Sequence, residues 1–236
     1  MQSVFISKII HIAVNKLERQ INLPVFSYLN WFPRKTKIFA QLQMRMDHNT
    51  LRDYIKQVSQ RIADEDIPLL ISCAQGRELK KGEPLLKEGE VCRAFYLVEK
   101  GYLRTWYNKD GVIINLNFTF EGDFATNLKS VKTRKASEFT IEAGEDTSVW
   151  IFNLDVIAEQ FNSHPSIILF IRRLTVNLLI ASEEHSNLFK IYTPTERYRF
   201  IEKNNPKLLQ RISLSQIASY LGVTRETISR IRGKRH

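Results

Sequence analysis

Three features of this 236-residue sequence predict an α+β protein. Between residues 77 and 152, apolar and polar residues alternate in short runs separated by glycine-containing turns, which predicts a double-stranded β-helix, or jelly roll. An apolar heptad pattern follows Pro165 and predicts one long helix. Residues 213–232 carry two short helical patterns joined at Gly222, which predicts a C-terminal helix-turn-helix.

The charge is distributed unevenly along the chain. The formal net charge is +10, and residues 193–236 hold ten Lys and Arg against three Asp and Glu. Residues 46–192 are mildly acidic, with 18 basic against 21 acidic side chains. A concentrated basic unit suits a polyanion, because each neutralised phosphate releases counterions. A solvated basic surface is the alternative interpretation of this unit.

Cysteine usage and hydropathy indicate the compartment. The two cysteines, Cys73 and Cys92, cannot build a disulfide framework or a four-cysteine metal or iron–sulfur site within one chain. No uninterrupted apolar run approaches the roughly 18 residues of a membrane span, and the first residues lack a basic region before their apolar stretch. We expect a cytoplasmic protein with no membrane partner.

The chain divides into four segments. Residues 1–45 are basic and irregular, and they are expected to be an extension that is disordered or that reflects a mis-assigned start codon at Met1, with translation starting at Met44 or Met46. Residues 46–163 form the jelly roll with flanking helices, 164–192 the long helix, and 193–236 the helix-turn-helix. A break at 191–195, with Thr195 capping the next helix, is the expected hinge.

Short strands build the jelly roll. Glycines at 82, 89, 101, 111 and 122 separate runs rich in Val, Ile, Phe, Tyr and Thr. The alternation in AFYLVEKGYLRTWY and VIINLNFTF fits strands half-buried against an interior that holds a small ligand, and a filled core is the alternative.

The long helix has two apolar stripes. The first follows an a/d spacing over three heptads and predicts the seam of a homodimer, formed by Ile167, Ile171, Leu174, Leu178, Ala181, His185 and Leu188. The second stripe is expected to face the jelly roll and comprises Ile168, Val176, Leu179 and Ile180. Burial of the whole helix within one monomer is the alternative.

The C-terminal segment ISLSQIASYLGVTRETISRIRGKRH fits a DNA-binding helix-turn-helix at each position. Ser213 or Ser215 begins the first helix, and Gly222 ends it in a left-handed conformation that glycine adopts without strain. Thr224 caps the second helix, whose residues Ile228 and Ile231 turn inward. An αα-hairpin with no role in DNA binding is the alternative.

The outward face of the second helix is predicted to read DNA bases. Arginine binds guanine O6 and N7, and glutamate accepts a hydrogen bond from cytosine N4, so Arg225, Glu226 and Arg230 are the predicted base-reading residues. A pair between Glu226 and Arg230 is the alternative role of the carboxylate. Hydroxyls and charges near the helix ends are predicted to contact phosphates and set the register, namely Ser213, Ser215, Thr224, Ser229 and Arg232.

A β-roll, a long helix and a terminal LGVTRETISRIR together resemble the Crp/Fnr family of bacterial transcription regulators, over residues 46–236. The stretch ERYRFIEKNNPKLLQRISLSQIASYLGVTRETISRIRGK is most similar to Bacteroidetes members, which stop soon after this helix. The resemblance implies a cyclic-nucleotide-binding-like domain and a homodimer on a palindromic DNA site with half-sites about one helical turn apart. Its base-reading Arg, Glu and Arg fall on Arg225, Glu226 and Arg230. RNA polymerase is a further implied partner.

The resemblance also implies an effector pocket. Members that bind cyclic nucleotides have a cassette in which Gly-Glu precedes Arg-Ser by some ten residues, the Glu holding the ribose and the Arg the cyclic phosphate. Here the cassette reads GDFATNLKSVKTRKASEF, and the candidate pocket residues are Gly122, Asp123, Lys132, Arg134 and Ser137. Ser137 and Glu138 occupy the Arg-Ser positions, so we expect no cAMP and leave the effector open.

Other classes of function fit less well. The histidines stand at 11, 48, 164, 185 and 236, so none lies in the roll to ligate a catalytic metal, and no P-loop or nucleophile elbow occurs. We therefore expect no enzyme and no cofactor. A small-molecule or cyclic-nucleotide sensor whose output is not DNA binding is the alternative function.

Overall fold

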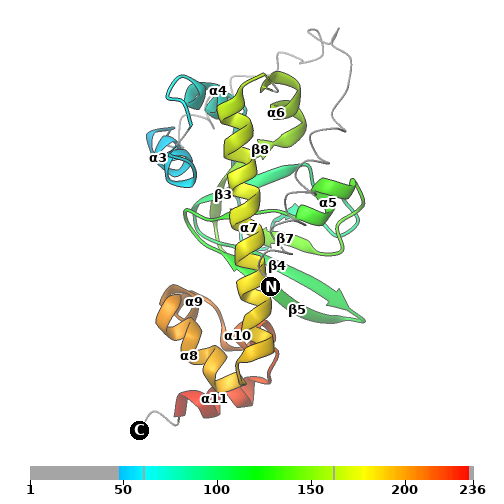
Figure 1. Cartoon of the computed structure of the whole chain (residues 1–236). Coiled ribbons are helices and arrows are strands. Elements are labelled where there is room, and N and C mark those ends of the chain that lie inside the picture. The colour runs from blue at the N-terminus through cyan, green and yellow to red at the C-terminus, as the bar shows by residue number, and fades with distance from the viewer. Residues whose placement is uncertain (1–47, 61, 162, 234–236) are drawn as a thin grey trace, which may run out of the picture. The chain divides into compact units, whose positions relative to one another are not determined.

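The computed structural model describes residues 48–60, 62–161 and 163–233 (Figure 1). The predicted extension, residues 1–45, lies outside them. Short helices come first, then the strands, then the C-terminal helices. The elements up to β8 are α3 (His48–Val58), α4 (Asp66–Ser72), β1 (Ala74–Leu79), β2 (Pro84–Leu86), β3 (Ala94–Lys100), β4 (Leu103–Lys109), β5 (Val112–Thr119), β6 (Phe124–Ala125), α5 (Leu128–Thr133), β7 (Thr140–Ala143) and β8 (Thr147–Asn153). The helices that follow are α6 (Leu154–Phe161), α7 (Pro165–Ile191), α8 (Pro194–Asn204), α9 (Pro206–Arg211), α10 (Leu214–Leu221) and α11 (Arg225–Gly233).

The strands form two four-stranded antiparallel sheets, in the orders β1-β8-β3-β6 and β2-β7-β4-β5. Alternate residues of both sheets are buried together between them, among them Leu79, Val98, Leu103, Ile141 and Val149. The predicted α+β class with a jelly-roll domain is therefore confirmed. These side chains pack on one another between the sheets. A ligand held within the roll stays a prediction.

Glycine is required at two of the predicted turns. Gly111 follows Asp110 in the two-residue connection between β4 and β5, where the φ angles are 86° and 52°. Positive φ at both positions matches the twist of a tight hairpin. At Gly101, φ is 87° and a Cβ would lie 2.6 Å from Thr147 Oγ1, so no side chain fits.

The outer face of the first sheet is covered by helices. Side chains of α3, α4, α6 and the first half of α7 form one buried cluster with Phe95, Trp150 and Phe152 of that sheet. The start of α7 is also tied to α4, because the carboxylate of Asp66 pairs with His164 Nδ1 at 2.8 Å and accepts a hydrogen bond from Ser166 Oγ. Hydrogen bonds from Ser166 and His164 hold the pKa of Asp66 below its ordinary value.

The two apolar stripes of α7 face the opposite way to the prediction. Ile167, Leu174 and Leu188 of the predicted seam are buried within this single chain. Ile171 and Leu178 pack against the same cluster that covers the sheet, and Ala181 is exposed. His185 is half-buried against the ring of Tyr220, with centroids 5.1 Å apart. The heptad spacing correctly indicated a helix side that packs against other residues, but these residues belong to the core of the same chain.

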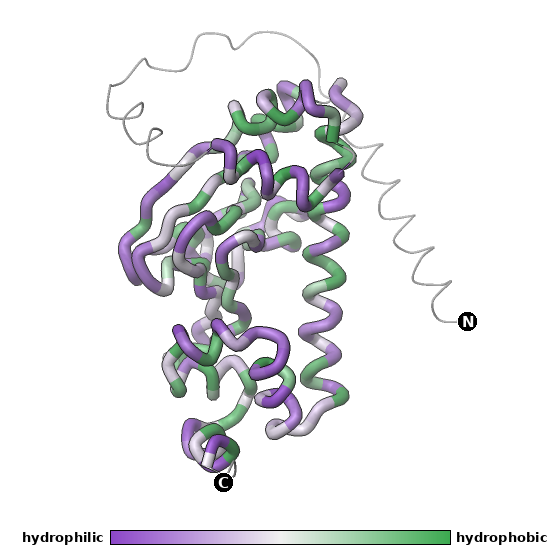
Figure 2. Tube along the Cα trace, turned by 90° about the vertical axis from the view of Figure 1, so that its left-hand side faces the viewer, coloured by the Kyte–Doolittle hydropathy of each residue, from purple (hydrophilic) through white to green (hydrophobic). Residues whose placement is uncertain are grey.

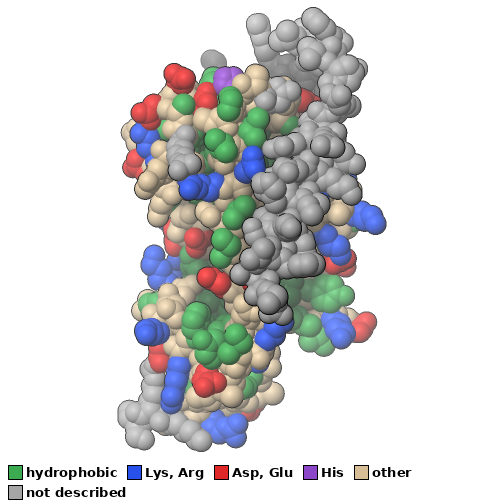
Figure 3. Space-filling model, in the orientation of Figure 1, with side chains coloured by type: hydrophobic (Ala, Val, Ile, Leu, Met, Phe, Trp, Pro, Cys, Tyr) green, Lys and Arg blue, Asp and Glu red, His purple; other side chains and the backbone are tan. Residues whose placement is uncertain are grey.

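The second stripe of α7 is exposed instead. Its residues Ile168, Val176, Leu179 and Ile180 are between 37% and 50% exposed, and the neighbouring Leu169, which was not predicted, is 47% exposed beside them. Hydrophobic residues recur along the whole of α7 (Figure 2), and Figure 3 shows hydrophobic side chains along this helix on the surface. By length and composition α7 would also suffice to cross a membrane, which is weak support for such a role.

The C-terminal helices share a core with the jelly roll. Tyr198, Ile217, Leu221 and Ile228 are buried in one cluster that includes Phe118 and Phe120. Helix α8 begins with a capping box in which Thr193 and Glu196 bond each other's backbone. The cap is thus Thr193 and not the predicted Thr195, because Pro194 occupies the first helical position.

Candidate nucleic-acid interface

Helix α10 begins and ends as its residue types require. The Ser213 side chain accepts a hydrogen bond from Gln216 N at 3.3 Å and caps the helix. Gly222 ends it with φ 66°, and the next residue, Val223, donates its N–H to Ala218 O at 3.0 Å. Between these ends Ile217, Ala218 and Leu221 are buried. The local steric reasoning from the sequence therefore predicted this helix correctly.

Helix α11 presents one apolar side inward and one polar side outward. Thr224 Oγ1 accepts a hydrogen bond from Thr227 N at 3.3 Å at the start of the helix. Ile228 is fully buried and Ile231 packs against the same cluster. The predicted base-reading residues and Ser229 and Arg232 are exposed.

Four outward side chains of α11 lie around one shallow, open area of the surface. Arg225, Glu226, Ser229 and Arg230 line an open depression of about 420 Å³. Within the described residues, the ion pairs do not include one between Glu226 and Arg230. The backbone at the start of the helix, the Thr224 hydroxyl and the Arg225 charge lower the pKa of Glu226. This carboxylate is thus an ionised acceptor close to the charge of Arg225.

The predicted phosphate-contacting hydroxyls occupy the helix starts. Ser213 and Thr224 precede α10 and α11, Ser215 lies in the first turn of α10, and all three residues are exposed. The first N–H groups of a helix have no partner within it and carry partial positive charge. These positions therefore suit phosphate oxygens, and their contact with DNA stays a prediction.

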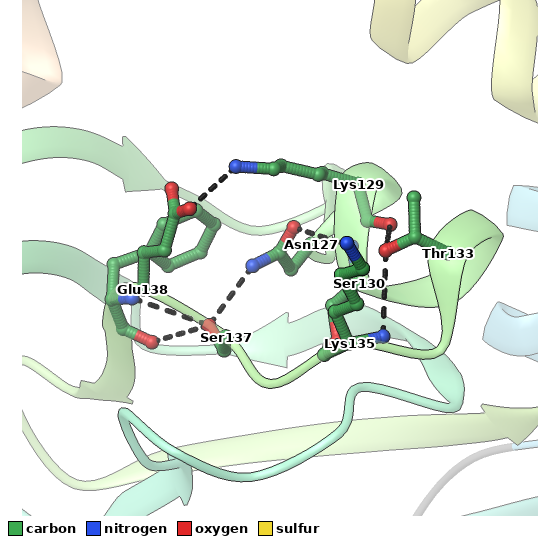
Figure 4. Close-up of polar contacts among 8 residues, drawn as sticks. Asn127, Lys129, Ser130, Thr133, Lys135, Ser137 and Glu138 are labelled. Carbon is green, nitrogen blue, oxygen red and sulfur yellow. Dashed lines mark hydrogen bonds and ion pairs between the residues drawn. The ribbon is translucent and has the colours of Figure 1, made fainter.

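The cassette after β6 is closed by neutral side chains (Figure 4). Asn127 Oδ1 accepts from Ser130 N at 3.0 Å, and Asn127 Nδ2 donates to Ser137 Oγ at 2.9 Å. The Ser137 hydroxyl in turn donates to the carbonyl of Phe139 at 2.6 Å. Asn127, Ser130 and Ser137 are at most 5% exposed. The buried polar atoms of this cluster satisfy one another.

The other predicted pocket residues lie outside this cluster. Asp123 is exposed and faces the charges of Lys207 and Glu121, and Lys132 is exposed on α5. Arg134 pairs with Asp155, which also pairs with Arg93. Gly122 packs against α3, because a Cβ there would lie 3.1 Å from the Tyr54 ring. Of the predicted pocket residues only Ser137 stands in the closed cluster, and the contact of all five with an effector stays a prediction.

Asn127 was missed by the sequence reasoning. The match of Gly122 and Asp123 to the Gly-Glu pair placed the predicted cassette four residues too early in the sequence. The signal that would have found Asn127 is the interval of ten residues to Ser137, which is the cassette's own spacing. With this register, a neutral amide and a hydroxyl stand where cyclic-nucleotide-binding members have Glu and Arg.

Over residues 48–60, 62–161 and 163–233, no group of three or more His, Cys, Asp and Glu side chains is arranged to hold a metal ion. Cys73 is half-exposed and Cys92 is buried, and both are free.

Comparison with known proteins agrees with this fold. Residues 76–164 match the family model of the cyclic nucleotide-binding domain. The structure of FixK2 from Bradyrhizobium japonicum is similar with a TM-score of 0.58 and 24% identity, over 68% of this chain and 83% of that one. A protein from Eubacterium rectale described as a transcriptional regulator of the Crp/Fnr family gives a TM-score of 0.55 at 21% identity, over 73% and 82%. No functionally curated protein matches the sequence.

A third similar structure is a protein from Ruegeria pomeroyi described as binding cyclic nucleotides, with a TM-score of 0.54 and 17% identity, over 80% of this chain and 88% of that one. The predicted resemblance to the Crp/Fnr family is thus confirmed at the level of the fold. The likeness to Bacteroidetes members stays a prediction.

Proposed function

We propose that this chain, which has the fold of the Crp/Fnr regulators, is a sequence-specific DNA-binding transcription regulator that acts in the cytoplasm as a homodimer on a palindromic site. The observation that carries the proposal is the outward side of α11, where Arg225, Glu226, Ser229 and Arg230 line one open hollow while Ile228 anchors the helix in the core. RNA polymerase, the further partner implied by the resemblance, stays a prediction.

The chemistry of this hollow suits a G·C-containing half-site. Each guanidinium can donate two hydrogen bonds to guanine O6 and N7, and the Glu226 carboxylate can accept from cytosine N4. A carboxylate that only faced phosphates would be repelled, so its presence on the same side of α11 as Arg225 and Arg230 favours contact with bases. The hydroxyls at the starts of α10 and α11 would hold the backbone on either side.

The exposed stripe of α7 supports the homodimer. Five large apolar side chains are exposed along one side of α7, where a second copy of the same helix can cover them. A two-fold axis along α7 would place two copies of α11 on one face of a duplex. The opposite side of α7 packs on the chain's own core, which argues against a membrane-spanning role.

The closed cassette supports a regulator that does not respond to cAMP. A cyclic phosphate is an anion, and burying it requires a charged or multiply donating partner. Asn127 and Ser137 use their polar atoms on each other, on Ser130 and on Phe139. Binding of cAMP would have to break these bonds, so we expect isothermal calorimetry to detect no tight binding.

Selection of binding sites from random DNA tests the proposal. We expect the wild-type protein to enrich a two-fold-symmetric sequence, and Arg225→Ala with Arg230→Ala to reduce affinity for that sequence by about a hundredfold or more, since each bidentate contact is worth about 1–3 kcal/mol. Lys109→Ala with Lys132→Ala, which removes the same charge from exposed sites on β4 and α5, is the control.

Two results would contradict the proposal. If the α11 double variant bound the enriched sequence as the control does, the base-reading assignment would be wrong. If the wild-type protein enriched no sequence at all, the chain would instead be a sensor module with another output, the alternative that the cyclic nucleotide-binding domain match supports.

A further inference from the structure

Arg197, in the first turn of α8, joins three separate points of the backbone. Its Nε donates to Tyr192 O at 2.9 Å and its Nη2 donates to Phe189 O, also at 2.9 Å. Its Nη1 donates to Leu221 O at 3.1 Å. A single guanidinium therefore contacts the end of α7 on one side and the end of α10 on the other.

These carbonyls are the ones that a helix end leaves without a partner. The last four C=O groups of a helix have no intrahelical donor and carry partial negative charge, so a cation stabilises them. Phe189 lies in the last turn of α7, Tyr192 is its C-cap, and Leu221 is the last residue of α10. Arg197 thus completes two helix ends at once, with its guanidinium also 4.7 Å from the centre of the Phe189 ring.

The contact lies directly before α11, the helix that carries the proposed base-reading residues. Leu221 precedes Gly222, and a Cβ at Gly222 would lie 3.8 Å from the Phe189 ring and 4.0 Å from Arg197 Nη1. From Gly222 the chain reaches the start of α11 at Arg225 within three residues. A fixed Leu221 carbonyl therefore also fixes the direction in which α11 leaves the turn.

Helix α8 itself is held firmly, so its guanidinium is a rigid link. Only Tyr192 and Thr193 separate α7 from α8, and Glu196 closes the capping box by accepting from Thr193 N at 2.8 Å. Tyr198, next to Arg197, is 2% exposed in the core of the C-terminal helices. The predicted hinge between α7 and α8 is therefore bridged by Arg197.

We propose that Arg197 is the positioning residue that sets the angle between α7 and the recognition helix α11, and so the half-site spacing that the dimer accepts. This inference rests on the proposed function, because α7 is taken as the dimer axis. Arg197 touches no base in this assignment; it acts through the Leu221 carbonyl and the turn at Gly222.

Lysine cannot replace arginine in this role. A guanidinium has five donors in a rigid plane and can hold three carbonyls in fixed directions, whereas an ammonium is a point charge on a flexible stem. Arg197→Lys keeps the charge and the stabilisation of the helix ends in part but loses the fixed geometry. It is therefore the informative substitution, and Arg197→Gln, which keeps one amide group as donor, is the second variant.

The test compares three versions of the symmetric DNA site selected by the wild-type protein. One has the selected spacing, and the others have one base pair added or removed between the half-sites, which shifts one half-site by about 3.4 Å and rotates it by about 35°. A duplex with a single half-site is the fourth probe. Arg199→Lys, on the exposed side of the same helix, is the matched control.

We expect the wild-type protein and Arg199→Lys to lose affinity by about tenfold or more when the spacing changes, the size of one lost specific contact. Arg197→Lys and Arg197→Gln should bind the three spacings within about threefold of one another, and the single half-site nearly as the wild type does. That pattern would show that α10 and α11 still bind a half-site but are no longer held at one angle to α7.

Three results would overturn the inference. A variant that kept the wild-type ratio between spacings would show that Arg197 does not set the angle. Equal losses on the single half-site and on the full site, or loss of folding in both variants, would make Arg197 an ordinary part of the domain core. A wild-type protein that selects no DNA would be recognised in the selection itself, and it would end the proposed function and this inference together.

Discussion

The hydroxyl of Ser219 on α10 bonds the free edge of strand β5: it accepts from the backbone N–H of Asn115 at 3.0 Å and donates to the carbonyl of Ile113 at 3.2 Å. Strand β5 is the last strand of its sheet, so these two groups have no neighbouring strand. Asn115 Nδ2 adds a hydrogen bond to Gln216 O at 3.4 Å. One side chain of the helix-turn-helix thus completes the edge of the jelly roll.

Ser219→Ala should loosen this contact without unfolding the protein. The Asn115 N–H and the Ile113 carbonyl would lose their partner, at a cost of about 1–3 kcal/mol. Amide hydrogen exchange at Asn115 should therefore speed up by about tenfold or more. Ser215→Ala, at an exposed position of the same helix, should leave that exchange rate unchanged. Equal protection in both variants would contradict the assigned role of Ser219.

Acid should weaken the second contact between the C-terminal helices and the roll. Arg211 Nη1 lies 2.9 Å from Glu121, Nη2 pairs with Glu145, and the guanidinium lies 5.4 Å from the centre of the Tyr102 ring. Burial raises the pKa of Glu121, but hydrogen bonds from Arg211 and from the backbone outweigh it, and the pKa is lowered overall.

The sign of the pH effect follows from this lowered pKa. A carboxyl with a lower pKa in the folded than in the unfolded state stabilises the fold above its unfolded pKa, and the gain is lost as pH falls through the folded value. We expect thermal unfolding to show a stability loss of about 1 kcal/mol below about pH 4.5 that Glu121→Gln removes. An unchanged pH profile in Glu121→Gln would show that this pair does not couple to folding.

The exposed stripe of α7 should carry dimerisation. Leu179→Glu with Ile180→Glu would bury charges in the proposed interface and weaken association by about 3 kcal/mol or more, roughly a hundredfold. Sedimentation equilibrium should then report folded monomers. Asn177→Glu with Ser182→Glu adds the same charges at exposed positions outside the stripe and should leave the dimer intact. A dimer that persisted in the stripe variant would place the interface elsewhere.

The other side of α7 should matter for folding instead. Leu174 is 3% exposed in the cluster that covers the first sheet, so Leu174→Ala should cost about 2–5 kcal/mol of unfolding free energy in chemical denaturation. If Leu174→Ala reduced dimer affinity and left stability unchanged, the heptad seam predicted from the sequence would be correct after all.

The stability of the closed cassette should depend on the Ser137 hydroxyl. Ser137→Ala leaves the Asn127 side-chain N–H without its buried acceptor, so we expect a loss of about 1–3 kcal/mol in unfolding free energy. The neighbouring Glu138→Ala removes an exposed ion pair with Lys129 and should cost less than about 1 kcal/mol. Similar losses for both would mean that the Asn127–Ser137 bond contributes little.

The success of sequence reasoning depended on how local the causes were. Gly222 and Ser213 follow from the geometry of a single helix end, so α10 could be predicted from a few residues. The two stripes of α7 were visible as stripes, but a period of hydrophobic residues does not say which neighbour covers which side. Ile167 and Leu174 were therefore assigned to the dimer seam, whereas they lie on the side of α7 that is buried within the chain.

Contacts between distant segments were out of reach. Ser219 bonds a strand about a hundred residues earlier, and Arg197 joins the ends of two helices that only the fold brings together. Neither residue has an unusual spacing or composition around it. Asn127 was within reach, because its ten-residue interval to Ser137 is a sequence feature, and a nearer match to a motif hid it.

The bond between Asn127 and Ser137 bears on how a cell would control this protein. If the cassette binds no ligand, the concentration of a metabolite does not set the fraction of active protein. The rates of synthesis and degradation of the protein then set how much active protein is present. If the protein acts as the proposed homodimer, two copies must meet before a DNA site is bound, so occupancy at low abundance would rise with roughly the square of the amount present. The DNA occupancy of such a regulator would rise steeply once its concentration passed a certain level, so expression of its own gene would act as the regulatory signal.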